Sequence, residues 1–125
     1  MNQNVSLKFL FPVPKVFYSF PIHFLRIASS NTSNKGIFRI LNSLLENEYM
    51  TIDDVVNSTM KELTQNRNFG KKGLLILLNL LETISHKPEL ILETKTLEQG
   101  LRDEIELIIQ EPLIKEQLLE LGINI

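Results

Sequence analysis

The most apolar helical segment of the chain, residues 71–84, restricts the possible folds more than any other feature. Its apolar side chains cover more than one face of a helix: Leu74, Leu75, Leu77, Leu78, Leu80, Leu81 and Ile84. A helix that is apolar on several faces must be surrounded by other elements. We therefore predict an all-α fold, a compact helical domain with residues 71–84 as its central helix.

Three further helices are predicted between residues 37 and 65. The first carries the stripe of an amphipathic helix, with apolar residues at i, i+3, i+4, i+7 and i+8, and ends near Asn47: Ile37, Ile40, Leu41, Leu44 and Leu45. Two short helices follow, over residues 52–57 and up to about residue 65. Each begins with a capping box, Thr51 with Asp54 and Thr59 with Glu62, in which a threonine and an acid three residues later satisfy backbone amides.

A tight turn over residues 67–70 joins the second short helix to the central helix. Asn68 tolerates a left-handed backbone and Gly70 adopts one freely, whereas Phe69 between them should enter the core. Helix, turn and helix together form a helix-hairpin-helix element. The free amides at the start of its second helix, next to Lys71 and Lys72, suit a phosphate.

Charge is unevenly distributed along a chain whose net charge is −2. Residues 26–87 hold eight Lys or Arg against six Asp or Glu, and residues 88–125 hold three against nine. A local basic cluster surrounds the turn: Lys61, Arg67, Lys71 and Lys72. Such a cluster favours a nucleic-acid partner, and the competing interpretation is an ordinary solvated helix end.

The chain divides into three segments on composition. Residues 1–35 are an aromatic, proline-containing segment and a polar linker, which we expect to lie over the core or a partner as an extended N-terminal arm. Residues 36–87 are the helix-hairpin-helix domain. Residues 88–125 form an appendage of acidic amphipathic helices, which either pack on the core or dock to a protein partner.

Several function classes lack the residues that they need. The chain has no cysteine, and His23 and His86 lie far apart in the sequence. No nucleophile and base, and no set of metal ligands, can be assembled, so we expect no enzyme activity, no metal and no cofactor. No apolar run reaches the roughly 20 residues that span a bilayer, so we expect no membrane contact and a cytoplasmic, nucleoid-associated protein.

Residues 36–84 resemble the C-terminal domain of the bacterial RNA polymerase alpha subunit. The likeness rests on an arginine followed three residues later by an asparagine, Arg39 and Asn42, and on the Gly70-Lys71-Lys72 motif at matching spacing. Asp54 and Glu62 match the acids of the two short helices. The sequence departs from the pattern at Gly73, where the family has serine, and at Ile76, where it has an acid.

The resemblance implies a DNA surface on the first helix and on the turn before the last. Arg39 would enter the minor groove of A·T-rich DNA, with Asn42 one turn on, while the Gly70 turn and Lys72 hold phosphates. The full set of candidate DNA-binding residues is Arg39, Asn42, Ser43, Arg67, Asn68, Gly70, Lys71, Lys72 and Gly73.

The sequence therefore favours a non-enzymatic DNA-binding transcription factor or RNA polymerase accessory protein. Its partners would be A·T-rich double-stranded DNA and RNA polymerase or another transcription protein. Two alternatives stay open. One is a protein-protein interaction module, and the other is a non-specific DNA-binding accessory subunit of a nucleic-acid enzyme.

Overall fold

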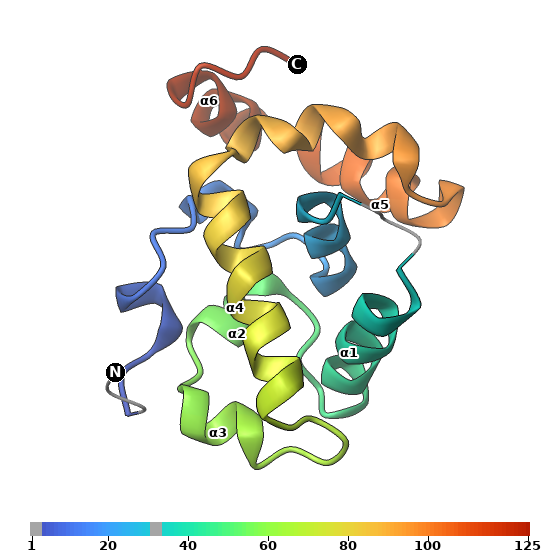
Figure 1. The fold of residues 1–125 in the computed structure, drawn as a ribbon. Coiled ribbons are helices and arrows are strands. Elements are labelled where there is room, and N and C mark those ends of the chain that lie inside the picture. Colours follow the sequence, from blue (N-terminus) through green and yellow to red (C-terminus); the bar gives the residue numbers. More distant parts are fainter. Residues whose placement is uncertain (1–3, 31–33) are drawn as a thin grey trace.

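The computed structural model describes residues 4–30 and 34–125 and shows a helical protein (Figure 1). Its α-helices are α1 (Lys35–Glu46), α2 (Ile52–Val56), α3 (Met60–Thr64), α4 (Lys71–His86), α5 (Gln99–Ile109) and α6 (Pro112–Glu120). Its 3-10 helices are η1 (Leu7–Phe9), η2 (Lys15–Phe17), η3 (Ile22–Ala28) and η4 (Pro88–Thr96). Over the described ranges, β pairing is limited to two isolated bridges. The predicted all-α class is confirmed.

Helix α4 occupies the middle of the molecule. Figure 1 shows α1 to one side of it, α2 and α3 near its beginning, and η4, α5 and α6 across its end. Leu77, Leu81 and Ile84 are completely buried, and Leu80 nearly so. These are positions of the apolar segment that predicted a central helix, so the pattern and the packing agree.

Capping side chains set where the first three α-helices begin. The Asn34 side chain accepts hydrogen bonds from the amides of Gly36 and Ile37, at 2.9 and 3.1 Å, and begins α1. Both predicted capping boxes are present, with Thr51 and Asp54 at α2 and Thr59 and Glu62 at α3. Each satisfies amides that a helix start leaves free.

The N-terminal segment differs from an extended arm. It folds into η1, η2 and η3, and two of its prolines begin 3-10 helices, since Pro14 and Pro21 are the N-caps of η2 and η3. A proline there loses little, because the amide that it lacks would have no partner in the first turn.

Backbone hydrogen bonds fasten this segment to the starts of α2 and α3. The Leu7 amide donates to the Ser58 carbonyl at 3.0 Å, and the Ile22 amide donates to the Met50 carbonyl at 3.0 Å. In the other direction, the amide of Ile52 donates to the Phe20 carbonyl at 3.1 Å. The N-terminal segment is thus hydrogen-bonded to the helical region that follows it. Of the polar linker that we expected to follow it, residues 31–33 lie outside the described residues.

Three phenylalanines of the N-terminal segment form the centre of the core. Phe17, Phe20 and Phe24 are completely buried, and their ring centroids lie 4.8 to 5.4 Å apart. Edge-on and tilted ring pairs at this separation contribute beyond their buried area. The aromatic residues that suggested a peripheral arm therefore supply the largest side chains of the interior.

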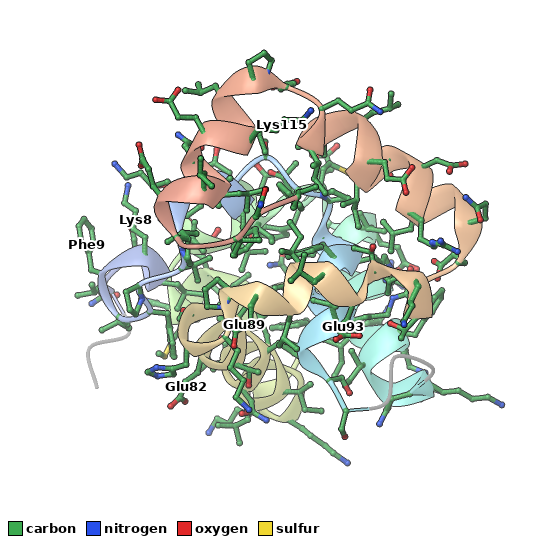
Figure 2. All side chains as sticks on the ribbon, turned by 90° about the horizontal axis from the view of Figure 1, so that it is seen from above. Lys8, Phe9, Glu82, Glu89, Glu93 and Lys115 are labelled. Atoms are coloured by element: carbon green, nitrogen blue, oxygen red, sulfur yellow. The ribbon has the colours of Figure 1, made fainter. Side chains whose placement is uncertain are left out.

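The acidic C-terminal segment packs on the same core. Its buried residues are Ile91, Leu97, Leu101, Ile105, Ile109, Ile114, Leu118 and Ile123, with α5 against η3 and α6 against η2. Gly122 ends this region in a left-handed conformation, with φ of +81°. Figure 2 shows Glu89 and Glu93 extending from η4. The core is continuous through all three compositional segments, and their division into domains stays a prediction.

No helix in the described ranges is long and apolar enough to cross a membrane.

Candidate nucleic-acid interface

A groove of about 1000 Å³ lies along the outer face of α1. Its second wall comes from the junction of η4 and α5, where Thr96, Leu97 and Glu98 line it. Four of the predicted DNA-binding residues line the groove: Arg39, Asn42, Ser43 and Asn68. The other five lie outside it, on the turn and on the first turn of α4: Arg67, Gly70, Lys71, Lys72 and Gly73. The structure thus brings the first helix and the turn close together.

Arg39 offers a free cation at this groove. Its side chain is exposed, and within residues 4–30 and 34–125 it forms no ion pair or hydrogen bond. Asn42 follows three residues later on the same helix and is half-buried. Residues three apart lie on one helix face, so the two side chains can reach a common ligand.

Asn42 is joined to residues of the other two segments by a chain of hydrogen bonds. Its Oδ1 lies 2.8 Å from Nε2 of His23, and Arg26 Nε donates to His23 Nδ1 at 3.0 Å. Arg26 in turn forms an ion pair with Glu98. Burial lowers the pKa of His23, and the Arg26 hydrogen bond lowers the pKa of Glu98.

Phe38 lies against this chain of polar side chains at the groove. The His23 and Phe38 ring centroids are 4.8 Å apart, and the Arg26 guanidinium carbon lies 4.9 Å from the Phe38 centroid. A guanidinium over an aromatic face gains cation-π attraction. Arg26 is only 4 % exposed, so its position is fixed by these neighbours.

The turn between α3 and α4 is held by the side chains of Ser43 in α1 and of Asn47, the residue that follows α1. Ser43 Oγ lies 3.1 and 3.2 Å from the carbonyl oxygens of Arg67 and Asn68, and Asn47 Nδ2 donates to the Arg67 carbonyl at 3.2 Å. Ser43 is 5 % exposed and faces the interior. Its hydroxyl fixes the turn, and direct contact of Ser43 with DNA stays a prediction.

The turn backbone agrees with the prediction at two of three residues. Asn68 is left-handed, with φ of +64°, and Phe69 is 3 % exposed in the core. Gly70 is instead extended, with φ of −105° and ψ of −166°, and is the N-cap of α4. It needs no left-handed freedom, because Asn68 alone reverses the direction of the backbone.

The beginning of α4 combines free amides with two exposed lysines. Gly70 has no side chain to cap the helix, so the amides of the first turn have no side-chain acceptor at that position. Lys71 and Lys72 are exposed, whereas Gly73 is buried. A Cβ on Gly73 would lie 3.4 Å from the Phe69 ring and face the core, not the groove.

Sequence reasoning missed His23, Arg26 and Glu98 as neighbours of the candidate site. The only local signal was the three-residue spacing of His23 and Arg26, inside a segment interrupted by prolines. Nothing in the sequence pattern indicated that Glu98 would contact Arg26. The described residues contain no group of three or more His, Cys, Asp or Glu that could hold a metal ion.

Comparison with known protein families gives a match over the candidate interface. Residues 38–83 match the family model described as the C-terminal domain of the alpha chain of bacterial RNA polymerase. This range covers all nine candidate DNA-binding residues and confirms the predicted resemblance. Neither curated proteins nor solved structures gave a match. The members of this family are helical domains that bind DNA in transcription. The match therefore indicates that residues 38–83 bind DNA in a transcription context.

Proposed function

We propose that this RNA polymerase alpha C-terminal domain-like protein is a non-enzymatic transcription factor or RNA polymerase accessory protein that binds the minor groove of A·T-rich DNA. The observation that carries the proposal is the free guanidinium of Arg39 beside Asn42, on the exposed face of α1 and close to the α3–α4 turn. Association with the nucleoid would follow from DNA binding.

The chemistry of the two subsites differs. The A·T minor groove is narrow and strongly negative, so it attracts an inserted arginine such as Arg39. The uncapped amides of α4 and the exposed Lys72 suit phosphate oxygens, which fix position without reading sequence. Arg39 should therefore set the preference for A·T pairs, and Lys72 should set affinity for any duplex.

Arg39→Ala tests the minor-groove assignment. We expect the preference for an A·T-rich over a G·C-rich duplex to disappear, because the arginine that occupies the narrow groove is gone. Fluorescence anisotropy titrations with both duplexes at fixed salt measure this ratio. Unchanged preference in Arg39→Ala would refute the assignment.

Two matched variants accompany that titration. Lys72→Ala should weaken binding to both duplexes and reduce the salt slope by about one, since one phosphate contact is lost. Lys115→Ala removes an exposed lysine on α6, seen in Figure 2, and should leave both affinities unchanged. Equal affinity of the unmodified protein for both duplexes would instead favour a non-specific DNA-binding accessory subunit.

Exposed leucines favour a second candidate, a protein-protein interaction module. Leu107, Leu113 and Leu119 are 68, 63 and 62 % exposed on α5 and α6, within the acidic segment. Apolar side chains on the surface of a charged helix pair are suited to docking a partner. Polar substitutions there, Leu107→Ser and Leu113→Ser, should release a co-purifying transcription protein without changing DNA affinity.

A further inference from the structure

We infer that His23 is a positioning residue, which orients the side-chain amide of Asn42 so that its NH2 group faces the groove and the DNA. This inference rests on the proposed function. It assigns a role in sequence preference to the N-terminal segment, which lies outside the family-like residues 38–83.

The direction of every hydrogen bond in this series follows from Arg26. A guanidinium can only donate, so Arg26 Nε, at 3.0 Å, makes His23 Nδ1 an acceptor. The neutral imidazole then carries its proton on Nε2, which donates to Asn42 Oδ1 at 2.8 Å. The amide oxygen of Asn42 is therefore engaged by His23, and its two N–H donors are left for other partners.

That orientation suits the A·T minor groove. Both A·T and T·A pairs present only acceptors there, adenine N3 and thymine O2, whereas G·C pairs add the guanine amino donor. An asparagine that presents N–H groups matches the acceptors. The opposite amide orientation would present an oxygen to the groove and favour the guanine amino group. His23 thus selects the orientation of Asn42 that discriminates against G·C pairs.

The His23 ring is itself held in place on several sides. Arg26 is anchored by its ion pair with Glu98, and both Arg26 and His23 lie against Phe38. The positioning contacts therefore run from the η4–α5 junction, through η3, to α1. A side chain locked by packing and hydrogen bonds keeps its geometry better than one on an exposed helix face.

Protonation of His23 would break this arrangement. A proton on Nδ1 would face the Arg26 Nε–H, so two donors would meet. The charged groups that face the ring are Arg26, whose charge opposes protonation, and Glu98 at the η4–α5 junction, whose charge favours it. Below the pH at which His23 becomes charged, the A·T preference should decrease while phosphate-driven binding persists.

Paired substitutions of His23 test the inference. His23→Phe keeps a ring beside Phe38 but removes both hydrogen bonds, and should lower the A·T to G·C affinity ratio about three- to tenfold. His23→Gln offers an oxygen to Arg26 and an N–H to Asn42, and should restore most of the ratio. His86→Gln, which changes an exposed histidine on α4, is the matched control and should leave the ratio unchanged.

A double-mutant cycle separates positioning from a merely structural role. In an Asn42→Ala background, His23→Phe should cause no further loss of the ratio, because His23 acts through Asn42. An equal loss in that background, or a His23→Gln ratio as low as that of His23→Phe, would overturn the inference. Thermal melts of each variant confirm that the comparison is made between folded proteins.

The inference and the proposed function fail in different ways. If the unmodified protein binds no duplex, the proposed function fails and the inference fails with it. If the protein prefers A·T-rich DNA and His23→Phe retains that preference, the inference alone fails. Nitrogen NMR of the free protein adds a direct readout, with Nε2 protonated and Nδ1 bare at neutral pH. The opposite tautomer would overturn the inference.

Discussion

His23 and Ser43 lie near the groove and act on it indirectly, each by a hydrogen bond to another residue. Ser43 is nearly buried, and its hydroxyl lies against the carbonyl oxygens of the turn that carries Arg67 and Asn68. His23 reaches the site only through Asn42. Sequence spacing placed Ser43 on the correct helix, but the direction of its side chain depends on how α1 packs against the turn.

Stability should fall because of His23 as the pH is lowered from neutral through 6.5, the ordinary pKa of histidine. Burial holds its pKa below the ordinary 6.5, so the folded state binds this proton less readily than the unfolded protein. The contribution of His23 to the free energy of unfolding is fully present above pH 6.5. It is lost as the pH falls through the lowered pKa that His23 has in the folded state. Urea unfolding midpoints across this range measure the loss.

Two histidine variants serve as comparisons for the urea unfolding series. In His23→Gln the unfolding midpoint should change less across the same range, whereas His86→Gln should keep the full dependence. Glu98, whose pKa is also lowered, loses its contribution only below its ordinary 4.5, so it does not act in this range. A midpoint that is equally pH-dependent in His23→Gln would contradict the assignment to His23.

The elements were predicted best where local chemistry defines their ends. Both capping boxes and the glycine at the start of α4 lie where the sequence placed them. The 3-10 helices η1, η2 and η4 were not predicted, because η1 and η2 have only three residues each and so no hydrophobic period, and η4 has only Ile91 buried. Such short turns take their conformation from their neighbours.

Removal of the cap at α3 should destabilise the protein by about 1 kcal/mol. Thr59 Oγ1 accepts from the Glu62 amide at 3.1 Å, and Glu62 Oε1 accepts from the Thr59 amide at 3.0 Å. Thr59→Ala removes the first bond, and Thr59→Ser keeps it. Chemical unfolding should show the loss for alanine and little change for serine. Equal losses would mean that the threonine methyl group, not the cap, matters.

The N-terminal segment lies outside the family-like residues 38–83 but contributes much of the packing of the whole molecule. Side chains of η3 pack against α1 and α4, and backbone hydrogen bonds join the N-terminal segment to the starts of α2 and α3. Residues 38–83 are thus completed by residues on both sides of them. The same arrangement brings Arg26 and Glu98, 72 positions apart, into contact at the groove.

The fragment of residues 34–87 should therefore fail to fold by itself. Without η1 to η3, the core would lose Phe17, Phe20 and Phe24, and the sides of α1 and α4 that pack against η3 would face water. Circular dichroism melts and proton NMR should show a non-cooperative, poorly dispersed fragment next to a cooperative full-length protein. A cooperative melt of the fragment would show that residues 36–87 are an independent domain after all.

The sequence by itself determined the all-α class, the central helix, the caps and the position of the glycine turn, because each depends on residues within one or two turns of one another. It also placed Arg39 and Asn42 on one helix face. Only the tertiary structure decided that the proline-containing segment enters the core and that Glu98, Arg26 and His23 form a chain of contacts that ends at Asn42. Those contacts join residues from three segments, and hydrophobic burial, which is non-directional, brings such segments together without a local sequence signal.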